Sequence, residues 1–232
     1  MLAGHFTTAL IARQKFPKGT LLYFLIISQL QDFLWFTFHY VRLEPTYPTD
    51  AFDTTLSNMV VDMLYSHDLL PQLFWLVIVF LLGRFLFKST KIGLVSASLV
   101  TIHFILDFFS GHMHHLFGAD SMDAGLGLYA SNPYLAIFIE ALFSIVALWY
   151  FFREEAKNGI IRSTKNRIGI ISVFAYGIIF MLLIATNSFR ELFGIPEFDL
   201  GFNTNMPTLI FTYTAMLYCL NYFVPKFTLD KK

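Results

Sequence analysis

Six apolar runs of membrane-spanning length constrain this chain more than any other feature of its sequence. They cover residues 20–41, 70–87, 92–110, 133–152, 168–186 and 206–224. About 20 apolar residues in a helix cross the roughly 30 Å hydrocarbon core of a bilayer, where the backbone must satisfy its own hydrogen bonds. The chain is 56% hydrophobic, with a mean hydropathy of +0.60. It therefore predicts an all-α, polytopic membrane helix bundle of six transmembrane helices, folded as a single integral membrane domain over residues 1–232.

Basic residues are concentrated in alternate connecting segments. All of the 16 Lys and Arg residues except Arg42 and Arg190 lie in the segments that would face one side of the membrane. Because cytoplasmic loops are enriched in Lys and Arg, both ends of the chain are predicted to be cytoplasmic. The 16 acidic residues bring the net charge to zero, so no nucleic-acid partner is expected. The single cysteine, Cys219, excludes an internal disulfide and a cysteine-based metal cluster.

The first 12 residues are apolar but too short to span a membrane. We expect them to form a short N-terminal helix that is either re-entrant or interfacial. A re-entrant helix of about twelve residues would be about 18 Å long and would place His5 near the middle of the bilayer. A helix lying flat on the inner surface would leave His5 remote from the other polar groups.

The clearest polar pair inside an apolar run is His103 with Asp107. Residues four apart share one face of a helix, and ionisable groups in hydrocarbon are costly unless something compensates their charge. The predicted orientation places further polar residues at the same depth, between the midplane and the outer surface: Asp32, His39, His67 and Glu140, with His112, His114 and His115 just beyond. Simpler interpretations are a packing role for His39, a helix-pairing role for Glu140 and a solvated loop for the histidines at 112–115.

Imidazole nitrogens and carboxylate oxygens together are the ligands of zinc and other divalent first-row metals. Three such ligands and an open position can lower the pKa of a bound water toward neutrality. An additional carboxylate, Glu140 or Asp62, is a candidate general base or a candidate support for a ligand. A proton path through the same groups is the other way to compensate their charge.

Short motifs in the first half of the chain carry a family resemblance. They are Gly4-His5, Leu30-Gln31-Asp32, Ser66-His67-Asp68-Leu69-Leu70, and His103 with Asp107. Their order resembles the bacterial membrane-bound metal-dependent hydrolase-like family, which includes LexA-regulated members. It is also similar to the ligand order of zinc-dependent phospholipase C and its nuclease relatives. The resemblance implies a multi-pass protein of the bacterial inner (cytoplasmic) membrane with a divalent metal, zinc first, whose ligands are Asp32, His67, His103 and Asp107, with His5 or His112 completing a second metal site.

The leading hypothesis is a membrane-embedded metal-dependent hydrolase that works among membrane lipids. Its substrate would be a phosphoester or lipid-linked molecule in the outer half of the bilayer. The alternative is a small permease or proton-coupled transporter that uses the same buried His, Asp and Glu groups. A b-type haem protein with paired histidines such as His39 and His103 is a third possibility, and a purely structural or assembly role is a fourth.

Overall fold

The computed structural model describes residues 2–198 and 201–229 as a bundle of helices. The remaining residues of the predicted 1–232 domain, at 1, 199–200 and 230–232, lie outside that description. The helices are α1 (Leu2–Lys15), α2 (Leu21–Ser28), α3 (Leu30–Tyr40), α4 (Leu69–Leu86), α5 (Thr90–Ser110), α6 (Leu128–Ser131), α7 (Pro133–Lys157), α8 (Thr164–Leu183), α9 (Phe189–Phe193) and α10 (Asn205–Phe223). Two short antiparallel pairs join β1 (Thr46–Tyr47) to β2 (Val60–Val61) and β3 (Ile160–Ile161) to β4 (Thr228–Leu229).

Within residues 2–198 and 201–229, four helices, α4, α5, α7 and α8, are long and apolar enough to cross a membrane. A fifth span is added if α2 and α3 are counted together. Large apolar side chains on the outward faces of these helices are exposed, as at Phe74, Val77 and Phe85 of α4. This exposure suits contact with lipid, because lipid tails are as apolar as the side chains that face them. The chain therefore has the features of a multi-span membrane protein.

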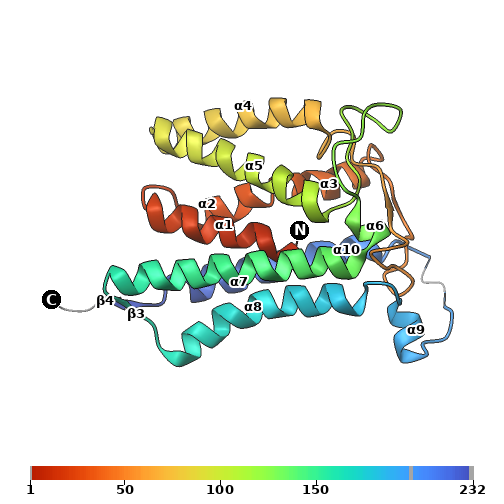
Figure 1. Cartoon of the computed structure of the whole chain (residues 1–232). Helices are drawn as coiled ribbons and strands as arrows, with labels where there is room; N and C mark the ends of the chain where they lie inside the picture. The colour runs from red at the N-terminus through yellow and green to blue at the C-terminus, as the bar shows by residue number, and fades with distance from the viewer. Residues whose placement is uncertain (1, 199–200, 230–232) are drawn as a thin grey trace.

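The N-terminal helix α1 lies in the middle of the bundle (Figure 1). It packs against α2, α5, α7 and α8, and its residues from Leu2 to Leu10 are all buried. Small side chains permit the close packing: a Cβ at Gly177 of α8 would lie 3.2 Å from the Cβ of Ala3. The structure thus favours the re-entrant arrangement over a helix lying flat at the surface, and it brings His5 into the interior.

The predicted span at 20–41 is broken into two helices that meet at a bend of 61°. At the bend the side-chain amide of Gln29 donates to the Leu2 carbonyl, 3.1 Å away, and the Ser28 carbonyl accepts a hydrogen bond from His103 Nδ1 at 2.8 Å. Irregular backbone at membrane depth is tolerated where protein groups satisfy it. The break in the helix therefore supplies hydrogen-bond partners for α1 and for the predicted site residue His103.

The two ends of the bundle are built differently (Figure 1). One end carries the short turns that follow α1 and α4, together with the β3–β4 pair. There the Arg162 guanidinium donates to both carboxylate oxygens of Glu155, at 2.6 and 2.7 Å, and to the Val224 carbonyl at 2.7 Å, which ties α7 to the end of α10. The other end carries the long connections at 41–68 and 111–127, and the described residues of the connection after α8, 184–198 and 201–204. There Arg190 joins two of these connections through Asp50 and Asp53.

Candidate metal centre

Five of the predicted site residues meet inside the bundle although they come from four separate segments. His5 belongs to α1, Asp32 to α3, and His103 and Asp107 to α5, while His67 precedes the first residues of α4. None is more than 5% exposed. The helix spacing predicted for His103 and Asp107 is observed, with His103 Nε2 3.0 Å from Asp107 Oδ2.

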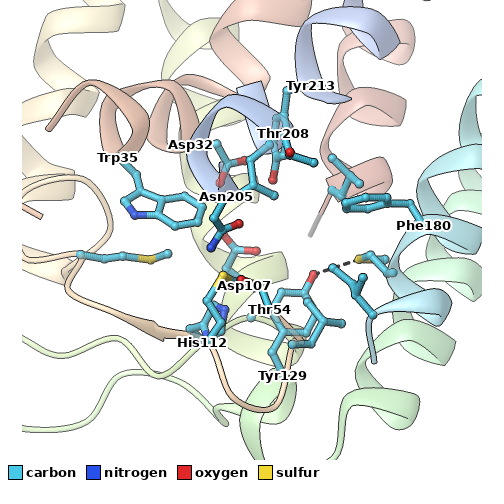
Figure 2. A pocket seen from close by; sticks show the side chains of 18 of the residues that line it. Asp32, Trp35, Thr54, Asp107, His112, Tyr129, Phe180, Asn205, Thr208 and Tyr213 are labelled. Carbon is cyan, nitrogen blue, oxygen red and sulfur yellow. Dashed lines mark hydrogen bonds between the residues drawn. The ribbon is translucent and has the colours of Figure 1, made fainter. Parts of the chain in front are cut away.

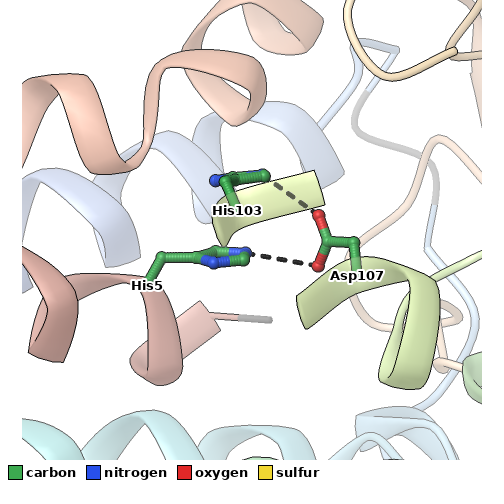
Figure 3. A group of neighbouring side chains, drawn as sticks. All are labelled: His5, His103 and Asp107. Atoms are coloured by element: carbon green, nitrogen blue, oxygen red, sulfur yellow. Dashed lines mark hydrogen bonds and ion pairs between the residues drawn. The ribbon is translucent and has the colours of Figure 1, made fainter. Parts of the chain in front are cut away.

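Asp107 is the centre of this group. Its Oδ1 lies 3.2 Å from His5 Nε2, and its Oδ2 faces His103 Nε2 at 3.0 Å and His67 Nε2 at 3.8 Å. Figure 3 shows the His5 and His103 rings on one side of the Asp107 carboxylate. The two rings are stacked, with centroids 3.6 Å apart and an interplanar angle of 11°. The stacking fixes both imidazoles relative to the carboxylate.

The second carboxylate, Asp32, completes the group from α3. Its Oδ1 lies 3.6 Å from His67 Nε2 and its Oδ2 lies 3.8 Å from His103 Nε2. These distances are too long for hydrogen bonds. Ligand atoms about 2.0–2.1 Å from a tetrahedral zinc are about 3.3–3.4 Å from one another, so the observed separations bracket those of a metal site. Two sets of three ligand atoms, His5–His103–Asp107 and Asp32–His67–His103, each fall within 4.8 Å.

The hydrogen bond of His103 defines the chemistry of its other nitrogen. A carbonyl oxygen only accepts, so the bond to Ser28 requires the proton to be on Nδ1. In the neutral ring, Nε2 then presents a lone pair to the carboxylates of Asp32 and Asp107. Lone pairs and carboxylates converging in a buried site repel one another unless a cation lies between them. Either a metal ion or a second proton on His103 provides that cation.

A network of buried polar groups holds His67 in place. The Ser66 hydroxyl lies 2.7 Å from His67 Nδ1, and Glu44 Oε1 accepts the backbone N–H groups of Tyr65 and Ser66 at 2.6 and 2.7 Å. Burial raises the pKa of the Glu44 carboxyl. On the other side Gln72 donates to the Ser66 carbonyl at 2.7 Å. The turn that carries His67 is therefore fixed from two directions, as expected for an outer shell that orients ligands.

Asp68 fastens the connection at 111–127 to this turn. Its two carboxylate oxygens accept the backbone N–H groups of His115 and Gly118 at 2.9 and 2.6 Å. Asp68→Ala is expected to lower the free energy of unfolding by about 3–6 kcal/mol, because two hydrogen bonds are lost and each hydrogen bond to a charged group contributes about 1.5–3 kcal/mol. Chemical denaturation and limited proteolysis of the 111–127 connection measure the effect. Asp120→Ala, in the exposed part of the same connection, is the control, and equal protease sensitivity of the two variants would contradict the assignment.

The two predicted catalytic carboxylates lie elsewhere. Glu140 of α7 is fully buried at the N-terminus of α1, where Oε1 accepts the backbone N–H groups of Ala3 and Gly4 and Oε2 accepts the Tyr129 hydroxyl at 3.2 Å. Asp62 is exposed and accepts the Leu64 N–H at 3.3 Å. Neither belongs to the two groups of candidate metal ligands. Among the described residues, Glu140 supports the helix that carries His5, and Asp62 belongs to the surface.

A cavity of about 70 Å³, room for several water molecules, adjoins the cluster. Asp32, His67 and Asp107 line it together with His112, His114, Trp35, Tyr129, Asn205, Thr208 and Tyr213, and its other walls are apolar. Figure 2 shows His112 and Tyr129 close to Asp107, with Trp35 and Phe180 on opposite sides of the cavity. The contributions of Trp35, Tyr129 and α10 were not predicted, because periodicity within one helix does not tell which other helix it faces.

The histidines at 112–115 divide into two kinds. His112 and His114 are buried, at 7% and 2% exposure, whereas the partly exposed His115 pairs with Asp123 at 3.1 Å. Burial lowers the pKa of His112 to about 4 and that of His114 well below its ordinary value. The expected solvated loop is therefore limited to His115 and Asp123, and to Asp120, which is exposed. The pattern His-x-His could have predicted that His112 and His114 point to the same side, because alternate residues of an extended segment share one face.

A haem does not fit this site. His103 is stacked on His5 and bonded to Ser28, and His39 Nε2 lies 2.9 Å from Asn203 Nδ2 outside the cluster. The donor set of imidazoles and carboxylates suits a divalent metal ion instead.

Comparison of the chain with protein-family models, with curated proteins and with solved structures finds no match. The interpretation of the site therefore depends on its geometry and chemistry.

Proposed function

We propose that the protein is a membrane-embedded, metal-dependent hydrolase with a single divalent ion, zinc first, held by Asp32, His67, His103 and Asp107. The observation that supports the proposal is that the Nε2 atoms of His67 and His103 each lie 3.0–3.8 Å from carboxylate oxygens of both Asp32 and Asp107, beside a cavity. His5 orients Asp107, because a proton on its Nε2 donates to Oδ1 and leaves Oδ2 for the ion. The net charge of two carboxylates and a divalent ion is zero, which suits a buried site.

The residues around the site favour hydrolysis. When bound, the ion would supply Lewis-acid chemistry that lowers the pKa of a coordinated water. The carboxylates of Asp32 and Asp107 orient such a water, and the cavity gives a substrate access to it. Reaction of water with a phosphoester forms a new P–O bond, breaks the bond to the leaving alcohol and transfers a proton to that alcohol. The apolar cavity walls suit a lipid-linked ester.

The arrangement of the inner half of the bundle favours an enzyme over a permease. Phe6, Leu10, Phe24 and Leu25 are fully buried along α1 and α2, between the cluster and the end that carries the basic turns. A continuous polar relay, as needed for proton-coupled transport, would have to pass these side chains. We therefore propose a site that is closed toward the cytoplasm and reached from the outer half of the membrane.

The proposed membrane topology has six spans with both ends cytoplasmic, in the bacterial inner membrane. α10 supplies the sixth span in addition to the helices and the bent pair described above. Polar residues on α10, including Asn205, Thr208 and Thr212, lower its hydropathy. Asn205 and Thr208 line the cavity, and Thr212 is buried. The concentration of Lys and Arg at the end with short turns supports this orientation.

Elemental analysis of the purified wild-type protein is the direct test of this function. We expect about one zinc or similar divalent ion per chain after gentle purification, and loss of hydrolysis of a chromogenic phosphodiester after chelation, with recovery on adding the metal back. The His115→Ala variant, outside the cluster, is expected to keep both metal and activity. Metal-free wild-type protein, with unchanged stability when zinc is added, would contradict the proposal. It would identify a protonated His103 as the compensating cation.

A further inference from the structure

The connection after α5 contributes two buried histidines that the proposed metal site does not use. His112 and His114 both line the cavity beside Asp107 and His67. The His114 ring is stacked on that of His67, with centroids 5.2 Å apart and an interplanar angle of 14°, and the His112 ring contacts Tyr129 edge-on at 5.3 Å. Neither histidine belongs to a group of candidate metal ligands among the described residues. Their place beside the cluster therefore needs a different explanation.

Both histidines carry ring nitrogens that find no hydrogen-bond partner within the described part of the chain. These are Nε2 of His112 and both Nδ1 and Nε2 of His114. A neutral imidazole carries one N–H donor and one acceptor nitrogen, so a buried ring without partners leaves a hydrogen-bonding group unsatisfied. A cavity lined by such donors offers a place for acceptor atoms of a ligand.

The backbone holds the two rings toward the cavity. His114 accepts from the Ala124 N–H at 2.7 Å through its carbonyl, and the Leu116 N–H donates to Met122 at 2.7 Å, so the segment is an extended ladder. Residues 112 and 114 share one face of that ladder, while Met113 is exposed and His115 pairs with Asp123. Asp68 anchors the same segment through the His115 N–H. The donors are thus pre-positioned without any ligand.

We propose that His112 and His114 form an oxyanion subsite, in which their ring N–H groups bind the non-bridging oxygens of a phosphoryl group whose phosphorus faces the metal centre. This inference rests on the proposed function, because a cation at the cluster offsets the charge of Asp107 and attracts the anion. Hydrogen bonds from positioned donors to phosphoryl oxygens stabilise charge that grows during phosphoester hydrolysis. The histidines act as substrate-binding groups and leave the metal to the four ligands.

Two substitutions of each histidine distinguish the contribution of its N–H donor from the contribution of its ring shape. Phenylalanine at 112 or 114 keeps the ring packing and removes the donor, whereas glutamine keeps a terminal N–H group near the position of Nε2. Phe variants are expected to bind phosphate about 10–100-fold more weakly, because each variant loses a hydrogen bond to a charged group. The Gln variants are expected to stay within about threefold of wild type. His115→Phe is the matched control outside the cavity.

Calorimetric titration of metal-loaded wild-type protein and variants with inorganic phosphate, and separately with dodecyl phosphate, tests the subsite. Metal content is measured in every sample. Tighter binding of dodecyl phosphate would identify a lipid-borne phosphoester as the source of the anion, and equal binding would identify a free phosphate group; both outcomes support the subsite. Full metal content without binding of either anion, or Phe variants that bind like wild type, would overturn it. Wild-type protein without metal would instead contradict the proposed function.

Discussion

Asp107→Asn is expected to abolish metal binding and hydrolysis while leaving the shape of the site unchanged. Asparagine has the volume of aspartate, but it has no charge and offers one acceptor oxygen where Asp107 offers two, facing His5, His67 and His103. With one of the two carboxylates lost, the zinc content is expected to fall below about one tenth of an ion per chain. Elemental analysis and hydrolysis of a chromogenic phosphodiester measure both effects.

Asp123→Asn is the matched control for this substitution. Asp123 also pairs with a histidine, His115, at 3.1 Å, but the pair lies outside the cluster and the Asp123 side chain is 67% exposed. This variant is expected to keep its metal and its activity. If Asp107→Asn is too unstable to purify, His5→Gln provides a second measurement: because His5 orients Asp107, metal affinity is expected to fall about 10–100-fold with the fold intact. Unchanged metal content in both site variants would exclude Asp107 as a ligand.

The sequence predicted the residues that meet in the cluster but did not separate them from others assigned to the same depth, because His39 and Glu140 lie outside the cluster. His103 and Asp107 lie four apart on one apolar helix, and Asp32 and His67 follow from the depth that the charge distribution assigns to each segment. This reasoning works because a membrane helix has a fixed rise per residue, so position in the chain gives depth in the bilayer. Burial of the cluster follows from the same argument.

Contacts between helices could not be predicted in the same way. Glu140 was predicted to share the depth of the cluster, yet its carboxylate faces the first turn of α1, because rotation of α7 about its axis is decided by packing against several neighbours. The break at Gln29 could not be predicted for a similar reason. The residues around it form a continuous apolar run, and the groups that stabilise the bend belong to α1 and α5. The depth expected for a residue follows from its position in its own helix, whereas contacts between helices depend on the tertiary structure.

Glu140→Ala is expected to destabilise the protein and to weaken the proposed metal site together. The first N–H groups of a helix have no partner within the helix, and at the start of α1 the Glu140 carboxylate accepts those of Ala3 and Gly4 in a fully buried position. A negative charge there also interacts favourably with the helix dipole. Leaving two buried donors unsatisfied, at about 1–3 kcal/mol each, is expected to lower the free energy of unfolding by about 2–6 kcal/mol. Chemical denaturation measures this loss.

The metal affinity distinguishes a positioning role for Glu140 from a catalytic one. His5 follows directly after Gly4, so a loosened first turn moves the imidazole that orients Asp107, and zinc affinity is expected to fall about 10–100-fold. Glu140→Gln, which keeps an acceptor oxygen, is expected to lie between alanine and wild type, and Glu154→Gln at the exposed end of α7 to have no effect. A Glu140→Gln variant with full stability and full zinc affinity but no turnover would identify Glu140 as a general base. The positioning role instead requires stability, metal affinity and turnover to fall in parallel, because all three depend on where the Glu140 carboxylate holds α1.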